Sequence, residues 1–317
     1  MRYLFFLFLC VSALFGAKMA EAESVYAVPS GIVTDILYSD AKLYVATESG
    51  KVEVFDTRTK KRIETVSLGK IEDFMGDEVD SKIFSIDRIG GTLLILSQDS
   101  GGYSRIHLFR DGKLVELIGR GDRLNIVKAK FIDEKTVLLA LISDDIIAYD
   151  IAGKKRKWTV QASMSKFSSF ALDNDRRRVA VADESGEVHL LSTGDGKTVR
   201  VLKGQNVVNI FGIDFKGDIV LTGGQDRRAA VYDVRSGTAY YRMSDFFVYG
   251  VGLSPSGKIA AYSSDINNNV TLFDTRTRVE VGKYKSNAAI VNGIVFVDEN
   301  AFFVNTSSHE VRYYKVR

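Results

Sequence analysis

The sequence is poor in the residues that most enzyme and metal sites require. Among its 317 residues it has one cysteine, Cys10, and three histidines, His107, His189 and His309. Three scattered histidines do not predict a three-ligand metal site. Neither a Gly-x-Ser-x-Gly elbow nor a His-Glu-x-x-His motif is present. We therefore expect no catalytic residues, no metal and no cofactor.

An excess of charge of one sign is also missing. The 43 Lys and Arg nearly balance the 40 Asp and Glu, which leaves a net charge of +3. Proteins that bind nucleic acids usually carry a clear basic excess or a basic stripe. The composition therefore gives no support for a nucleic-acid partner.

The sequence also lacks an apolar run long enough to cross a bilayer, which takes ~20 residues. The apolar run near the N-terminus, from Tyr3 to Phe15, is shorter than this. It follows the basic residue Arg2 and precedes Ala20-Glu21-Ala22, which fits the small-x-small rule of signal peptidase. This layout predicts that residues 1–22 are a signal peptide cleaved after Ala22. An uncleaved anchor is the alternative.

Removal of the signal peptide would also remove the only cysteine. Cys10 is preceded by Leu9, where lipidation requires a small residue, so we expect no lipid and no stable membrane anchor. Without a thiol, residues 23–317 can form no disulfide. Extracellular animal domains of this length more often carry disulfides. A bacterial periplasmic location is therefore expected, with residues 23–317 forming a single domain.

A repeat of about 41 residues organises the chain. The pentapeptide FDTRT occurs at residues 55–59 and again at 273–277, and related apolar stretches end at residues 110, 150, 192, 233 and 315. Each of the seven units holds four short stretches rich in Val, Ile, Phe and Tyr, separated by Gly, Asp, Asn and Ser. Such stretches predict strands joined by turns. A period of this length with four strands per unit is typical of a β-propeller.

The residues of these units resemble the WD40 family. LSPSGKIAAYSSD (residues 253–265) is similar to the family's first two strands and their turn, and FKGDIVLTGGQDRRAAVYDVRSG (residues 215–237) is similar to the core of a blade, with Tyr-Asp in place of Trp-Asp. The resemblance covers residues 23–317 and implies an all-β, seven-bladed WD40-like β-propeller with four-stranded blades. It also implies that an acidic residue tightens the connection between the second and third strands in six of the units, at Glu48, Asp99, Asp144, Asp183, Asp226 and Asp265.

The family's Gly-His pair is missing, and the only tryptophan, Trp158, falls in a predicted fourth strand. The complete hydrogen-bonded side-chain tetrad of WD40 blades is therefore not predicted. The last unit stops after three strands, and residues 24–31 can supply its fourth strand and close the ring. In FDTRT we expect Phe55 and Phe273 to be packed, and Asp56 and Asp274 to begin a turn.

Partner binding is predicted on the face where the fourth strand of one blade connects to the first strand of the next. The first repeat is longer than the others, and its excess falls in residues 70–81 and 97–105, both on this face. Aromatic and arginine side chains are the usual anchors of interfaces. We expect Tyr249 to belong to the core. The candidate partner-binding residues are Phe74, Met75, Asp77, Glu78, Arg120, Arg123, Arg227, Arg228, Phe246 and Phe247.

These features predict an exported, monomeric, non-catalytic interaction scaffold or accessory factor that binds protein partners. In general architecture the chain resembles the NapL family, the WD40-like accessory proteins of periplasmic nitrate-reductase systems. That resemblance implies a role in maturation or electron supply of the nitrate reductase. Two alternatives stay open, a propeller enzyme of the lactonase or quinoprotein type and an outer-membrane assembly scaffold.

Overall fold

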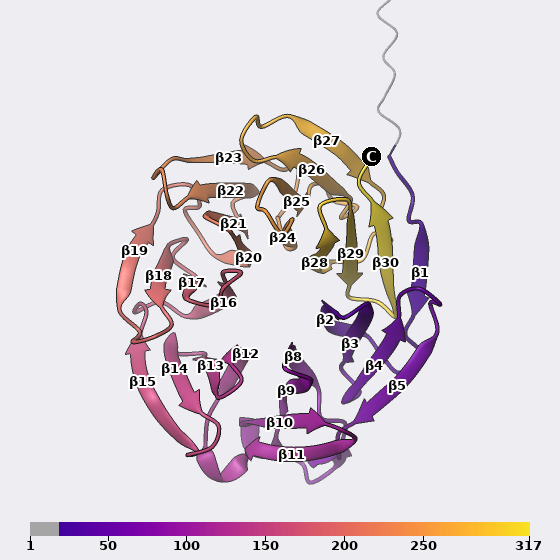
Figure 1. Cartoon of the computed structure of the whole chain (residues 1–317), viewed down its shortest axis with the longest axis vertical. Helices are drawn as coiled ribbons and strands as arrows, with labels where there is room; N and C mark the ends of the chain where they lie inside the picture. Colours follow the sequence, from indigo (N-terminus) through magenta and orange to yellow (C-terminus); the bar gives the residue numbers. More distant parts are fainter. Residues whose placement is uncertain (1–18) are drawn as a thin grey trace, which may run out of the picture.

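The computed structural model describes residues 19–317, and these form a ring of seven blades (Figure 1). Each blade is a four-stranded antiparallel sheet, as the repeat predicts. Residues 1–18, which hold most of the predicted signal peptide, lie outside the described residues. Within residues 19–317 no helix is long and apolar enough to cross a membrane.

The four strands of a blade, a to d, run from the centre of the ring to its rim. From blade 1 to blade 7, the a strands are β2 (Val33–Ser39), β8 (Ile83–Ile89), β12 (Ile126–Asp133), β16 (Phe167–Leu172), β20 (Ile210–Lys216), β24 (Val251–Leu253) and β28 (Val291–Asp298). The b strands are β3 (Lys42–Thr47), β9 (Thr92–Gln98), β13 (Thr136–Leu141), β17 (Arg178–Asp183), β21 (Ile219–Gly224), β25 (Ile259–Ser263) and β29 (Ala301–Thr306).

The outer half of each blade is made by strands c and d. In the same order, the c strands are β4 (Lys51–Asp56), β10 (Ser104–Arg110), β14 (Asp145–Asp150), β18 (Val188–Ser192), β22 (Arg228–Asp233), β26 (Val270–Asp274) and β30 (Glu310–Lys315). The d strands are β5 (Arg62–Ser67), β11 (Lys113–Ile118), β15 (Lys155–Gln161), β19 (Thr198–Leu202), β23 (Ala239–Met243), β27 (Glu280–Tyr284) and β1 (Ser24–Ala27).

The N-terminal strand closes the ring, which confirms the prediction. β1 pairs antiparallel with β30, with Ser24 opposite Tyr313 and Ala27 opposite Glu310. The Tyr26 ring packs edge-on against Phe55 of blade 1 and Phe303 of blade 7, with its centre 5.6 and 5.7 Å from the centres of their rings. The closing strand thereby covers an edge that would otherwise expose unpaired backbone groups.

Seven apolar clusters form the core, and each lies between two neighbouring blades. Strands b and c alternate their side chains between the two sheet faces, and both faces are buried because a blade stands on either side. The b strands accordingly read as continuous apolar runs, as in β13, where Val137 to Ala140 are fully buried. Stability therefore depends on contacts around the whole ring.

The two FDTRT copies are structural, as predicted. Phe55 and Phe273 are buried at the ends of β4 and β26. Asp56 accepts hydrogen bonds from the backbone N–H groups of Arg58 and Thr59 at 3.0 and 2.8 Å, and Asp274 repeats this arrangement in blade 6. The N–H donated by Thr59 lowers the pKa of Asp56. Each copy thus ends strand c and shapes the turn into strand d.

The rim is held by side chains of the d strands that reach the c–d turn of the next blade. Tyr26 donates to the Thr57 carbonyl at 3.4 Å, Trp158 to the Thr193 carbonyl at 3.1 Å, and Tyr240 to the Thr275 carbonyl at 2.6 Å. The Trp158 ring also covers Gly196, where a Cβ atom would stand 2.7 Å from the ring. Trp158 is therefore a docking residue between blades 3 and 4.

Candidate functional site

The two faces of the ring differ in the apolar side chains that they expose. Because strands alternate in direction, the b–c and d–a connections share one face, called here the d–a face, and the a–b and c–d turns share the other. We leave the outer d strands aside. Within residues 19–317, the other face then exposes a single large apolar side chain, that of Val279. On the d–a face the large exposed apolar side chains are Phe74, Met75, Phe84, Ile142, Met164, Val207, Val208, Ile266 and Ile290.

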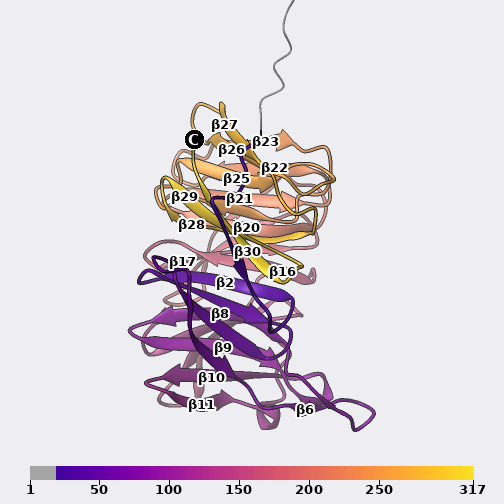
Figure 2. The ribbon, with the colours of Figure 1, turned by 90° about the vertical axis from the view of Figure 1, so that its right-hand side faces the viewer.

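A hairpin between blades 1 and 2 carries two of these side chains at its tip. β6 (Ile71–Glu72) pairs with β7 (Glu78–Val79), and Figure 2 shows the hairpin extending beyond the body of the ring. Asp73 fixes the tip by accepting the N–H groups of Met75 and Asp77 at 2.8 and 3.0 Å. Phe74 and Met75 are consequently 90% and 85% exposed. Predicted residues Asp77 and Glu78 are exposed beside them.

Four aromatic rings cluster beside the central channel on the same face. Phe246, Phe247 and Tyr249 come from the loop between β23 and β24, and Phe211 comes from the start of β20. Phe246 stacks on Phe247 at 4.8 Å and Phe211 on Tyr249 at 5.0 Å. All four rings are half-buried. We call them the mouth cluster.

The expectation that Tyr249 belongs to the core is wrong. In the loop it is the intervening Val248 that is fully buried, among apolar residues of blades 5 and 6. The backbone N–H groups of Tyr249 and Gly250 are held by Ser263 Oγ at 3.0 and 3.3 Å. Tyr249 lines both the central cavity and the neighbouring depression. Phe211 was missed because its strand was expected to be core.

The predicted arginines have different surroundings. Arg228 lies 4.3 Å over the Tyr241 ring and donates to the Gln205 carbonyl at 2.7 Å, so it is committed to packing within blade 5. Arg227 is exposed beside it. Arg120 and Arg123 are exposed at either end of the 3-10 turn η2 (Arg120–Asp122). Of the four, Arg228 is the least available to a partner.

The candidate residues form two groups on one face. The hairpin and η2 flank blade 2, whereas Arg227 and the mouth cluster belong to blades 5 and 6, across the ring in Figure 1. A second 3-10 turn, η1 (Ser100–Gly102), accounts for the extra length in residues 97–105. Phe84 and Ile290 line a depression of about 420 Å³ with Phe211 and Tyr249. The depression therefore extends from the mouth cluster towards blades 2 and 7, with polar as well as apolar side chains in its lining.

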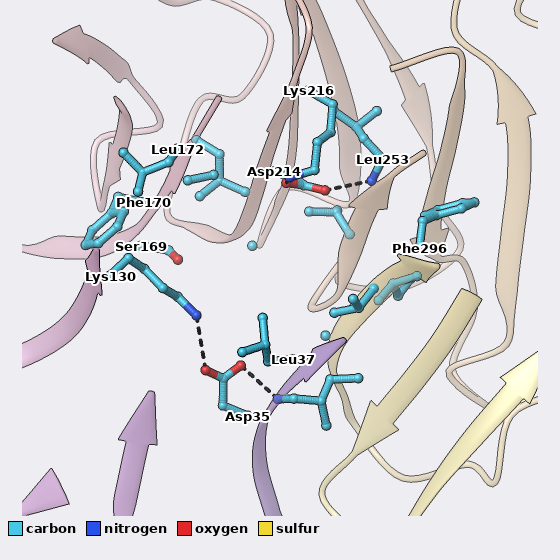
Figure 3. Close-up of a pocket in the computed structure, with 18 of the residues that line it drawn as sticks. Asp35, Leu37, Lys130, Ser169, Phe170, Leu172, Asp214, Lys216, Leu253 and Phe296 are labelled. Atoms are coloured by element: carbon cyan, nitrogen blue, oxygen red, sulfur yellow. Dashed lines mark hydrogen bonds and ion pairs between the residues drawn. The ribbon is translucent and has the colours of Figure 1, made fainter. Parts of the chain in front are cut away.

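The centre of the ring encloses a cavity of about 490 Å³ lined by the a strands (Figure 3). Its carboxylates join neighbouring blades. Asp35 accepts the Ile86 N–H at 2.9 Å, and Asp214 accepts the Leu253 N–H at 2.8 Å. Each of the two also faces an ammonium group, Lys130 Nζ at 3.4 Å for Asp35 and Lys216 Nζ at 3.5 Å for Asp214. These charges are structural ties between blades.

Lys128 differs from the other cations of the cavity. Its Nζ donates to Ser169 Oγ at 2.9 Å and lies 5.4 Å from the centre of the Phe170 ring. Within residues 19–317 no carboxylate lies within 4.0 Å of this ammonium group. Burial, and then repulsion from Lys130, lowers the pKa of Lys128 to about 8. The sequence feature that could have revealed this lysine is the stretch IVKAKFID (residues 126–133), which places two lysines in a strand that should be apolar.

Short polar networks join the d–a loop to the b–c turn in two of the blades. In blade 5, Asn206 of the d–a loop donates to Asp226 at 3.0 Å and accepts from Thr222 at 2.5 Å. In blade 4, Ser163 donates to Asp183 at 2.6 Å. In both blades the side chain that makes the connection, Asn206 or Ser163, belongs to the d–a loop.

Asp144 is the exception among the acidic residues of the b–c turns. Its side chain is fully buried and neither carboxylate oxygen has a hydrogen-bond partner in the described part of the chain. Burial, reinforced by the nearby Asp183 carboxylate, raises the pKa of Asp144 to about 7. The residue can therefore stay protonated in a mildly acidic solution.

The histidines of strand c occupy structural positions. His107 is buried in β10, and its Nε2 lies 3.9 Å from Glu116 of the neighbouring strand. Burial, followed by repulsion from Arg105, lowers the pKa of His107 to about 4. His189 Nε2 lies 3.7 Å from Asp183.

Comparisons with protein-family models and with curated protein sequences find no match to this chain.

Proposed function

We propose that the protein is an exported, non-catalytic scaffold that binds a partner protein through its d–a face. The observation that carries this proposal is the uneven distribution of exposed apolar side chains, which favours the d–a face over the opposite one. Contiguous exposed apolar surface rimmed by polar residues is typical of protein-interaction sites. The N-terminal pattern of residues 1–22 supports export.

Two contact areas carry the binding in this proposal. The hairpin tip offers Phe74 and Met75 ringed by Glu72, Asp77 and Glu78, and suits a partner surface with an apolar pocket bordered by basic residues. The mouth cluster offers stacked aromatic rings, which bury a large area at a low cost in side-chain entropy. Arg227 extends this second area.

The finer form of the proposal is an accessory role in a periplasmic nitrate-reductase system. It is supported by the resemblance of the chain to the NapL family in architecture, export signal and cysteine content. The protein would then act on maturation or electron supply of the reductase through contact with one of its components. The expected mature protein begins at Glu23, is monomeric and has no membrane anchor.

The test is site-specific photo-crosslinking in the source cells. A photo-reactive residue replaces Met75 at the hairpin tip, or Val199 on the outer strand β19, where the side chain is 57% exposed. We expect Met75 to crosslink a defined protein and Val199 to give none. A second variant, Phe74→Ser with Met75→Ser, should release that protein, whereas Val199→Ser with Val201→Ser should retain it.

Equal crosslinking from both positions, or undiminished capture by the hairpin variant, would refute binding through this face. Identification of the crosslinked protein as a nitrate-reductase component would support the finer role, and an unrelated partner would exclude it. The intact mass of the purified protein tests processing, which should leave Glu23 as the first residue.

A further inference from the structure

The charges that line the central cavity do not all pair. Lys130 faces Asp35, Lys216 faces Asp214, and the guanidinium of Arg176 pairs with Asp87. Asp173, also in the lining, pairs at 2.8 Å with Arg178, which lies outside the lining and pairs with Asp218 as well. Lys128 is left as a cation with one polar contact, Ser169 Oγ. Within residues 19–317 the lining therefore carries one positive charge that no carboxylate balances at contact distance.

The ammonium group of Lys128 can bind more than it does. An ammonium has three N–H donors, and one of them is used, by Ser169 at 2.9 Å. A charge in partly buried surroundings is costly unless it is paired and hydrogen-bonded. An anion of single charge placed beside Lys128 would supply both the missing charge and the missing acceptors. The hydroxyl of Ser169 could then donate to the same anion.

Apolar side chains in the rest of the lining suit an anion that also has an apolar part. Four blades contribute apolar side chains to the wall, namely Leu37, Leu172, Leu253, and the neighbouring pair Val295 and Phe296 (Figure 3). The volume of about 490 Å³ lies within the range of sites that hold small organic ligands. An apolar wall with few polar groups that fix orientation is the usual construction of such sites.

We propose that the central cavity binds a small organic monocarboxylate with an apolar body, its carboxylate held by Lys128 and Ser169. The single unpaired ammonium of Lys128 matches a singly charged carboxylate. The body of the ligand lies along the apolar wall. Phe211 and Tyr249 of the mouth cluster also line this cavity, so the site adjoins the partner-binding face, but the proposal does not depend on partner binding.

The charge state of Lys128 makes the proposal sensitive to pH. The charged groups that act on its ammonium are Lys130 on the same strand, Asp35 of β2 and Asp214 of β20. With its pKa lowered to about 8, Lys128 loses its proton in alkaline solution. Carboxylate binding should favour the protonated form, so the affinity should be constant below that pH and decrease above it.

The experiment measures binding of hexanoate and phenylacetate to residues 23–317 by calorimetry, with hexanamide as the neutral match. We expect at least one carboxylate to bind, with hexanamide weaker by about tenfold or more, the effect of losing one charged hydrogen bond. Lys128→Met should weaken carboxylate binding by about tenfold or more, and Ser169→Ala by a smaller factor. Lys216→Met is the matched control, because Lys216 lines the same cavity but is paired with Asp214.

The results separate the possible outcomes. The proposal is overturned if neither carboxylate binds at a ligand concentration of ~10 mM. A dissociation constant above that concentration corresponds to a binding free energy weaker than ~−3 kcal/mol, where contacts are non-specific. Equal weakening by Lys128→Met and Lys216→Met also overturns the proposal, because it would mean that the total charge of the cavity, and not Lys128, attracts the anion. If Lys128→Met fails to fold, the pH series on the unmodified protein decides, because an affinity unchanged from pH 7 to about 10 contradicts a role for its ammonium.

Discussion

Asp87 and Arg176 form an ion pair although they belong to blades 2 and 4. Arg176 leaves the a–b turn of blade 4, donates to the Phe131 carbonyl of blade 3 at 2.6 Å, and reaches Asp87 beyond it. The Asp87 side chain is 3% exposed and also accepts the Phe131 N–H at 2.7 Å. One arginine therefore ties three consecutive blades together at the centre of the ring.

Arg176→Met should destabilise the protein by roughly 3 kcal/mol, because it leaves the buried carboxylate of Asp87 without its cation. The measurement is the free energy of unfolding in urea. Arg177→Met is the control, since Arg177 is exposed in the same turn, and surface substitutions usually change stability by less than about 0.5 kcal/mol. Equal effects of the two changes would contradict the role given to Arg176.

The closing strand supplies a second prediction. Tyr26 is 4% exposed and packs on aromatic rings of blades 1 and 7. Tyr26→Ala should lower the free energy of unfolding by about 3–5 kcal/mol, as for other large buried aromatics. Val25→Ala in the same strand should have little effect, because Val25 is 49% exposed. A melting temperature unchanged by Tyr26→Ala would show that β1 is dispensable for the ring.

Asp144 supplies a third prediction, which concerns pH. Its pKa is raised from 3.8 to about 7 in the folded protein. Below pH ~4 both the folded and the unfolded states hold the proton and stability is unaffected. Between pH ~4 and 7 the Asp144 carboxyl is ionised in the unfolded state but still protonated in the folded state, so the free energy of unfolding falls as the pH rises. Above pH 7 the loss of stability has its full size. The shift corresponds to on the order of 4 kcal/mol.

Asp144→Asn should therefore stabilise the protein at pH 8, by roughly 2 kcal/mol since a buried amide also needs partners. The gain should shrink as the pH is lowered to 4. Asn also suits the left-handed backbone at this position, where φ is 66°. Thermal unfolding across this pH range measures the effect. Asp145→Asn, at the next position, should show no such trend, and a trend in both would locate the cause elsewhere.

Lys128 gives the opposite pH trend. A lysine whose pKa falls from 10.5 to about 8 on folding destabilises the protein fully below pH 8, and the penalty disappears as the pH rises to 10.5. Its size is on the order of 3 kcal/mol. Lys128→Met should therefore stabilise the protein at pH 7, with a gain that decreases towards pH 10. A destabilised variant would show that the lysine is needed for the fold.

A suitable control for Lys128→Met is Lys197→Met, because the Lys197 side chain is 83% exposed. That change should leave the melting temperature nearly constant at every pH. A stabilising Lys128→Met together with lost carboxylate binding would be a trade of stability for function, which is common at binding sites.

The sequence predicted the parts of the fold that depend on local, repeated patterns. Seven units of four strands, the FDTRT turns and the closing role of residues 24–31 all follow from strand alternation and the missing fourth strand of the last unit. The position of the hairpin followed from the one interval that departs from the period. Each of these depends on residues close in sequence or on the count of strands.

The centre of the ring was not predictable in the same way. The partner of Arg176 is two blades away, and nothing in its own turn indicates that it reaches Asp87. Lys128 and Lys130 are two positions apart in one strand, yet Lys130 pairs with Asp35 whereas Lys128 contacts only Ser169. Such differences depend on the neighbouring blades. The same holds for Tyr249, which local pattern placed in the core.

Closure of the ring by β1 makes the completion of the fold depend on blade 7, the last of the seven blades in sequence order. β1 is synthesised first, but its partner β30 ends at Lys315. The Tyr26 ring therefore has only half of its contacts until blade 7 exists. A chain that ends before β30 would keep an open edge, and its exposed backbone would mark it for aggregation or proteolysis. In this protein the closed state thus reports that blade 7 has been made.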